Sequence, residues 1–180
     1  MVIAIDFDGT CVTHEFPVVG KDIGAVPVLK RMVESGHQLI LHTMRSDRPI
    51  GGDIGDPSIS DVTGMLLTDA VNWFKEHDIP LYGIQSNPTQ HHWTTSPKAY
   101  AEIYIDDAAL GCPLVYPEGG RRPYVDWVEV EKILEKDGIL KPIGECRHYG
   151  REVRVEFVRN LDGTERPVTY IYCSDRGKKL

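Results

Sequence analysis

The chain has 180 residues, of which 41% are hydrophobic, enough for one domain with a buried core and a small appendage. Its net charge of −7 argues against non-specific nucleic-acid binding as the main activity, because phosphate contacts need clustered Lys and Arg. The chain has no apolar run of membrane-spanning length, and it starts without a signal-peptide pattern. We therefore expect a cytoplasmic protein that makes no membrane contact.

Charge is distributed unevenly along the chain. Residues 1–144 contain 12 basic and 21 acidic side chains, whereas residues 145–180 contain 8 and 6. The four cysteines are widely spaced and form no CxxC pair, so the sequence indicates reduced thiols and neither a zinc ribbon nor a dense disulfide framework. We predict a core domain over residues 1–144 and a separate C-terminal appendage over residues 145–180.

The stretch Val-Ile-Ala-Ile-Asp-Phe-Asp-Gly-Thr at residues 2–10 places two carboxylates at the end of an apolar strand. Side chains alternate along an extended chain, so Asp6 and Asp8 are expected to point the same way while Phe7 turns to the core. Two carboxylates at such a short distance repel each other unless a cation lies between them or one of them holds a proton. A hard divalent cation with oxygen ligands, in the first place Mg2+, satisfies the first condition.

Apolar periodicity predicts strands that alternate with helices along the remainder of the core domain. We expect helices over residues 26–35, 66–77 and 126–138, and further strands over residues 38–43, 80–84, 99–105 and 111–117. This alternation predicts an α/β fold, a doubly wound Rossmann-like parallel sheet of about five strands with flanking helices. The carboxyl ends of such strands form the edge where ligands bind.

Four short motifs resemble those of the haloacid dehalogenase superfamily. Residues 6–10, Asp-Phe-Asp-Gly-Thr, match its first motif, and Thr43 at the end of the next strand matches its second. Lys98 stands where the third motif has a lysine, and the pair Asp106-Asp107 closes a strand as the fourth motif does. The resemblance covers roughly residues 1–135.

The resemblance implies hydrolysis of a phosphate monoester through a phosphoaspartyl intermediate. Asp6 would attack phosphorus, and Asp8 would protonate the leaving oxygen and then activate water. Lys98 would neutralise the nucleophile and the phosphoryl charge, and the Thr43 hydroxyl would position phosphoryl oxygens. These four residues are the predicted catalytic set, and Thr43 and Lys98 are also predicted to bind substrate.

The same resemblance implies a Mg2+ site made from both acidic strand ends. Asp6, the backbone carbonyl of Asp8, and Asp106 would hold the ion, with Asp107 bound through water or orienting a ligand. Two functions remain open besides phosphatase. One is a phosphotransferase that passes the phosphoryl group to an alcohol, and the other is a non-catalytic phosphate-binding or regulatory module.

The sequence does not identify the phosphorylated substrate. The spacing between the motifs leaves no room for the cap domains that larger members of the superfamily insert, so the substrate is either a small molecule or a macromolecular end. Arg45 and Arg48 flank the start of the irregular loop 46–64, and Arg45 is a predicted substrate contact. The basic tail leaves nucleic acid open as a partner, although nothing else in the sequence indicates it.

The appendage has the pattern of a β-hairpin. Apolar residues alternate with polar ones over residues 153–157 and 168–172, and the Asn-Leu-Asp-Gly segment at 160–163 separates the two runs. A two-stranded hairpin alone is marginally stable in water. We therefore expect it to dock on the core or on a second subunit. Docking on a second subunit would make the protein a homo-oligomer.

Overall fold

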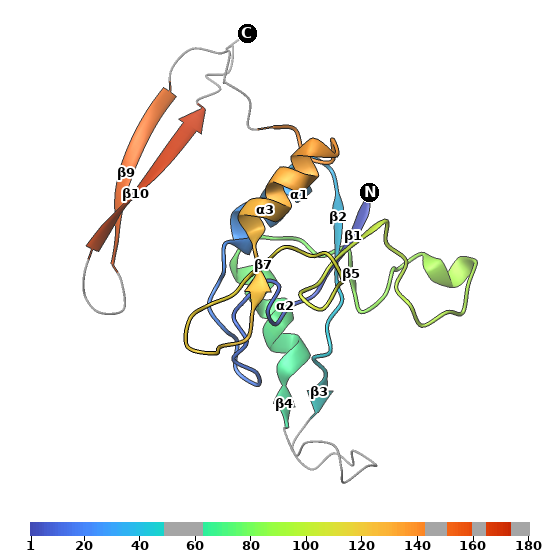
Figure 1. Ribbon diagram of the computed structural model, residues 1–180. Helices are drawn as coiled ribbons and strands as arrows, with labels where there is room; N and C mark the ends of the chain where they lie inside the picture. The colour runs from blue at the N-terminus through green and yellow to red at the C-terminus, as the bar shows by residue number, and fades with distance from the viewer. Residues whose placement is uncertain (49–62, 143–150, 160–164, 174–180) are drawn as a thin grey trace. The chain divides into compact units, whose positions relative to one another are not determined.

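The computed structural model describes residues 1–48, 63–142, 151–159 and 165–173, the last two ranges by their backbone alone (Figure 1). The chain forms two compact units, Met1–Leu140 and Lys141–Leu180. The predicted boundary between residues 144 and 145 falls outside the described residues.

Unit Met1–Leu140 is built on a four-stranded parallel sheet with the strand order β5-β2-β1-β6. The strands are β1 (Val2–Ile5), β2 (Gln38–Leu41), β5 (Gly83–Ile84) and β6 (Ile103–Ile105). Strand β1 lies at the centre, with Ile5 opposite Leu41 on one side and Ile105 on the other. The residues that follow these strands therefore meet at one edge of the sheet.

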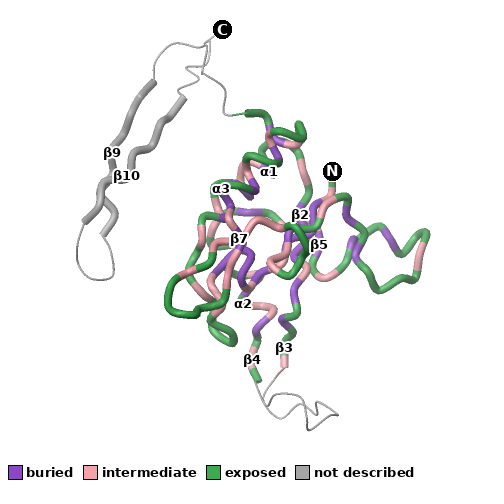
Figure 2. Tube along the Cα trace, viewed as in Figure 1, coloured by how far each residue is buried: buried purple, intermediate pink, exposed green. Residues whose placement is uncertain are grey.

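Three helices cover this sheet: α1 (Ala25–Glu34), α2 (Leu66–Glu76) and α3 (Trp127–Lys136). All three contribute to a single core cluster with alternate residues of the strands, namely Ile3, Ile5, Leu39, Leu41 and Ile105. The helices therefore share one face of the sheet, and Figure 1 shows the 3-10 turn η1 (Gln90–His92) beyond the other face. Ala4 and Ile40, which point to that other face, are also buried (Figure 2).

Carboxylate side chains set the starts of two helices. Asp22 accepts hydrogen bonds from the backbone N–H groups of Ala25 and Val26, at 3.1 and 3.3 Å, in the first turn of α1. Asp126 accepts from the backbone N–H groups of Val128 and Glu129 and thus caps the start of α3. These caps determine where each helix leaves the sheet edge.

The sequence predicts an α/β fold with a parallel sheet, and this is confirmed, but the fifth strand is placed wrongly. Strand β7 (Leu114–Val115) pairs antiparallel with β8 (Tyr124–Val125) in a sheet of its own. The chain reverses through Gly119 and Gly120, whose positive φ angles of 80° and 71° suit a tight return. A two-residue strand that turns back on itself cannot extend a parallel sheet.

Two further pairs complete the described structure. Strand β3 (Asp47–Arg48) pairs antiparallel with β4 (Gly64–Met65), so the ends of the predicted irregular loop lie together, while its residues 49–62 lie outside the described residues. In unit Lys141–Leu180, β9 (Arg151–Arg159) and β10 (Glu165–Cys173) pair antiparallel, which confirms the predicted hairpin. Among the described residues, no helix has both the length and the apolar character needed to cross a membrane.

Candidate active site

The carboxyl ends of β1, β2 and β6 surround a hollow of about 430 Å³. Asp6 follows β1, Thr43 follows β2, and Asp106 follows β6, so the parallel register brings residues far apart in sequence to one place. The residues that line the hollow are Asp6, Asp8, His14, Phe16, Thr43, Met44, Arg45, Asp106, Asp107, Ala108 and Arg122. Six of the seven predicted site residues are in this set.

Three carboxylates form an acidic cluster within this hollow. One oxygen from each of Asp6, Asp106 and Asp107 lies within 4.8 Å of the other two. The pKa of Asp6 is raised to about 7. Burial is the largest cause, the charges of Asp106 and Asp107 also raise this pKa, and hydrogen bonds from the Phe7 N–H and the Thr10 hydroxyl lower it. The protein thus gathers negative charge that its own groups only partly compensate.

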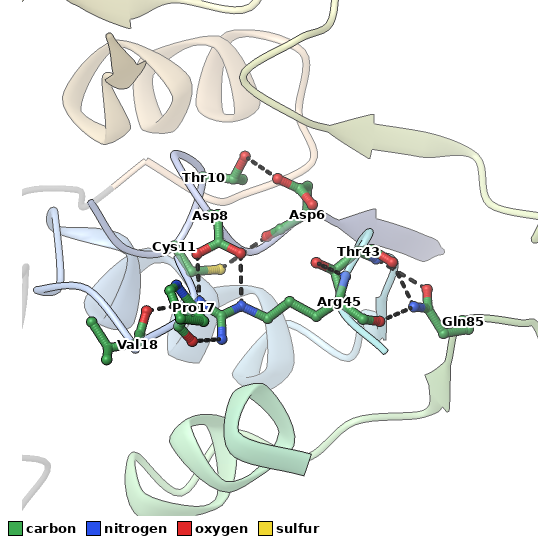
Figure 3. A network of polar contacts seen from close by, with 9 residues as sticks. All are labelled: Asp6, Asp8, Thr10, Cys11, Pro17, Val18, Thr43, Arg45 and Gln85. Carbon is green, nitrogen blue, oxygen red and sulfur yellow. Dashed lines mark hydrogen bonds and ion pairs between the residues drawn. The ribbon is translucent and has the colours of Figure 1, made fainter. Parts of the chain in front are cut away.

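Thr10 connects the two acidic strand ends. Its hydroxyl, which is fully buried, donates to Asp6 Oδ2 at 3.2 Å (Figure 3). The same hydroxyl accepts from the backbone N–H of Asp107 at 3.0 Å. Its carbonyl accepts a hydrogen bond of 2.6 Å from the Trp127 indole N–H at the start of α3. The Thr10 hydroxyl, which both donates and accepts, therefore fixes the distance between two acidic loops. The first acidic loop follows β1 and contains Asp6, and the second follows β6 and contains Asp107.

Asp8 has a different partner from the acidic cluster. Its two carboxylate oxygens accept from Nε and Nη2 of Arg45, both at 2.7 Å, in a bidentate ion pair (Figure 3). Arg45 is only 1% exposed, and its guanidinium also donates to the carbonyl oxygens of Pro17 and Val18, at 3.0 and 2.9 Å. Arg45 thus lies in the site as predicted, but its guanidinium is bound to Asp8 and the backbone.

Thr43 lies beside this pair and is held by Gln85, which follows β5. The Thr43 N–H donates to Gln85 Oε1 at 3.0 Å, and the Gln85 side-chain amide donates back to the carbonyls of Thr43 and Arg45. The Thr43 hydroxyl accepts from the Arg45 N–H at 3.3 Å, which leaves its proton available for an oxygen in the hollow. The side chain is 8% exposed.

Close packing joins the first acidic loop to Asp107 through His14. His14 Nε2 lies 3.1 Å from Asp107 Oδ2. A Cβ atom added at Gly9 would lie 2.1 Å from that same nitrogen, and Gly9 has a φ of +80°. Only glycine fits this position, for steric and conformational reasons together.

Lys98 lies apart from the other predicted site residues. Its ammonium group stands 5.0 Å from the centre of the Tyr104 ring, and it lines a different hollow with Trp93 and Tyr100. Tyr104 is the middle residue of β6 and points away from the core cluster. The predicted contact of Lys98 with the nucleophile therefore stays a prediction.

The cluster has the chemistry of a divalent-cation site. Carboxylate oxygens are the hard ligands that Mg2+ prefers, and three of them approach one another closely enough to share one ion. Burial, and then the charges of Asp106 and Asp107, raise the pKa of Asp6, so a bound cation would favour its ionised form. Asp6, Asp106 and Asp107 therefore fit Mg2+, whereas the Asp8 carboxylate is occupied by Arg45.

Sequence reasoning missed several residues that shape the site. Gln85 has a positive φ of 60°, and its amide bridges two strand ends, but nothing in its sequence neighbourhood marks it. His14 and Arg122 come from irregular segments, so no periodicity predicts where they lie. Thr10 could have been found, because it belongs to the motif that contains Asp6.

Comparison with solved structures supports the overall fold. A conserved protein from Bacteroides thetaiotaomicron is 29% identical in sequence and superposes with a TM-score of 0.55, over 76% of this chain and 91% of that chain. The chain thus shares most of that protein's length, and the name of that protein specifies no activity. No protein-family model and no curated protein matches the chain.

Proposed function

We propose that the protein is a Mg2+-dependent phosphatase that hydrolyses a phosphate monoester through a phosphoaspartyl intermediate. The observation that carries this proposal is the cluster of Asp6, Asp106 and Asp107 at the carboxyl end of the central strands, beside Asp8 and Thr43. The resemblance of these motifs to the haloacid dehalogenase superfamily supports the same chemistry. A bound Mg2+ would balance the carboxylates and neutralise phosphoryl charge.

The nucleophile in this proposal is Asp6. Its carboxylate forms a bond to phosphorus while the bond from phosphorus to the alcohol oxygen breaks, and the alcohol leaves. Thr10 holds one oxygen of Asp6, so the carboxylate is oriented before the substrate arrives. Thr43, across the same hollow, donates its hydroxyl proton to a phosphoryl oxygen.

Asp8 transfers the protons of both steps. In its protonated form it gives a proton to the departing alcohol oxygen and is left as the carboxylate. It then takes a proton from the water that attacks the phosphoaspartyl group, which releases phosphate, restores Asp6 and regenerates protonated Asp8. Arg45 binds both oxygens of Asp8, but each carboxylate oxygen has a second lone pair. The clamp therefore holds the orientation of Asp8 and leaves it a site for the proton.

The first experiment measures hydrolysis of p-nitrophenyl phosphate with Mg2+ and with EDTA, for the wild type and for Asp6→Asn. We expect hydrolysis that needs Mg2+ and falls by a factor of about 10³ or more in the variant, because an amide cannot form the acyl phosphate. Asp137→Asn, an exposed change just after α3, is the matched control for loss of one carboxylate. Equal activity of Asp6→Asn and the wild type would refute the proposal.

A further inference from the structure

A second hollow, of about 340 Å³, adjoins the proposed active site. It is lined by Thr13, His14, Glu15, Pro117, Arg121, Arg122 and Tyr124. His14 and Arg122 also line the hollow that contains the acidic cluster, so the two spaces meet at these two side chains. A substrate whose phosphoryl group lies at Asp6 can thus extend into the second hollow.

The hairpin of β7 and β8 forms one side of this second hollow. The N–H of Val125 in β8 donates to the carbonyl of Gly9 at 2.8 Å, and Gly9 is the residue after Asp8. The base of the hairpin is thus bound to the loop that positions the proposed nucleophile. Its turn, which contains Arg121 and Arg122, is held beside the site by this bond.

The second hollow differs from the first in its charge. It contains two guanidinium groups and one carboxylate, Glu15, whereas the first contains four carboxylates and two guanidinium groups, those of Arg45 and of the shared Arg122. In the described part of the chain, neither Arg121 nor Arg122 takes part in an ion pair or hydrogen bond, in contrast to Arg45 with its four hydrogen bonds. Two arginines that have no partner among the described residues, and that lie beside a phosphate site, are available to a ligand.

From these observations we propose that the substrate is a phosphate monoester whose alcohol part bears a second anionic group, bound by Arg121 and Arg122. This inference rests on the proposed function. The phosphoryl group lies at the acidic cluster, the alcohol part passes His14, and the second anion lies between the two guanidinium groups. A carboxylate and a second phosphate share the chemistry that a guanidinium recognises, so both are tested.

The test uses substrate pairs that differ in the second anion. One pair is glycerol 3-phosphate and 3-phosphoglycerate, and the other is adenosine 5′-monophosphate and adenosine 3′,5′-bisphosphate. For each compound, kcat/KM is measured by phosphate release, and Ki is measured against hydrolysis of p-nitrophenyl phosphate, so compounds that turn over slowly are also ranked. We expect the member with the second anion to be favoured by about tenfold or more in at least one pair, the size of one charge-assisted contact.

Single variants assign this preference to residues. Arg121→Ala and Arg122→Ala should each lower the ratio within the favoured pair by about fivefold or more, whereas Lys136→Ala, which removes an exposed positive charge at the end of α3, should leave the ratio unchanged. Because both arginines are exposed, the wild-type ratio should also fall as ionic strength rises. A purely structural effect of either variant would lower both members of a pair equally.

The outcomes separate this inference from the proposed function. Preference in the carboxylate pair, the bisphosphate pair or both supports the inference and identifies the anion. Ratios near one in both pairs, or ratios that survive both arginine variants, overturn it while Mg2+-dependent hydrolysis of p-nitrophenyl phosphate still stands. Absence of that hydrolysis, together with no turnover of any of the four compounds, overturns the proposed function and this inference with it.

Discussion

At the residue scale, the burial of Asp6 in the candidate site links folding stability to pH. Its pKa is about 7 in the folded protein against an ordinary value of 3.8, chiefly because the carboxyl is buried and then because Asp106 and Asp107 repel its charge. Between those two values the folded state holds a proton that the unfolded state has lost. The stability linked to this proton is therefore complete below about pH 4 and is lost as the pH rises through about 7.

The first prediction follows from that linkage. Without divalent cations, Asp6→Asn should be more stable than the wild type at pH 8, by on the order of 2 kcal/mol, and the difference should nearly vanish at pH 4. Urea unfolding in EDTA at the two pH values measures it. Adding Mg2+ at pH 8 should stabilise the wild type and leave the variant unchanged. A variant no more stable than the wild type at pH 8 would contradict the unbalanced charge at Asp6.

Arg45 lies in the predicted site, but its contacts differ from the predicted ones. The sequence predicts a substrate contact, but the structure buries the side chain against Phe7 and pairs it with Asp8. A buried bidentate guanidinium fixes the direction of the carboxylate it holds. We therefore regard Arg45 as a positioning residue for the proton transfers that we propose for Asp8.

Leaving groups of different basicity test this role of Arg45. Arg45→Lys retains the positive charge but loses the bidentate contact with Asp8. We therefore expect kcat to fall by about tenfold or more for an alkyl phosphate. The fall should be much smaller for p-nitrophenyl phosphate, because its leaving group, p-nitrophenolate, departs with little protonation. Arg31→Lys is the matched control, because Arg31 is also held by two carboxylates, Glu131 and Glu135, away from the site. Equal losses for both substrates would assign Arg45 a structural role only.

At the scale of elements, the turn after β1 brings the site together. Gly9 adopts a φ of +80° and leaves no room for a Cβ beside His14 and Asp107, while its carbonyl accepts the hydrogen bond from Val125 of β8. One residue thus determines the path of the first acidic loop, its contact with the second, and the anchor of the β7–β8 hairpin. A substitution there should disturb all three.

Gly36 provides the control for a substitution at Gly9. Its φ is +83°, but a Cβ at Gly36 meets no atom within 4 Å. Gly36→Ala should therefore cost about 1 kcal/mol of unfolding free energy from backbone conformation alone. Gly9→Ala should cost at least about 2 kcal/mol and should also lower Mg2+-dependent hydrolysis, because the added atom displaces His14 from Asp107. Similar costs and intact hydrolysis in both variants would rule out the close packing at Gly9.

The elements also show why part of the site could be predicted and part could not. Asp6, Thr43 and Asp106 each end a buried apolar strand, and parallel strands meet at one edge, so local sequence patterns were enough to bring them together. Gln85 follows the two-residue strand β5, and Arg122 lies in the turn before β8. The positions of both segments depend on tertiary contacts. The prediction of a fifth parallel strand was wrong for the same reason, because the turn between β7 and β8 determines that these strands pair with each other.

At the scale of the whole molecule, the chain combines a core domain with a two-stranded hairpin. Among the described residues, every member of the core cluster lies at or before Leu140, which is 1% exposed. The pair β9–β10 has nine residues in each strand and no third strand among the described residues. Two strands are marginally stable in water, so the hairpin is expected to depend on another surface.

Removal of the hairpin should therefore leave the core domain folded and active. A chain that ends at Pro142 keeps every residue of the core cluster, so we expect cooperative thermal unfolding and Mg2+-dependent hydrolysis of p-nitrophenyl phosphate close to that of the full chain. If a second copy covers the hairpin, light scattering should give a dimer for the full chain and a monomer for the shortened one. A monomeric full chain whose melting temperature falls by more than about 5 °C on truncation would instead indicate that the hairpin packs on its own core.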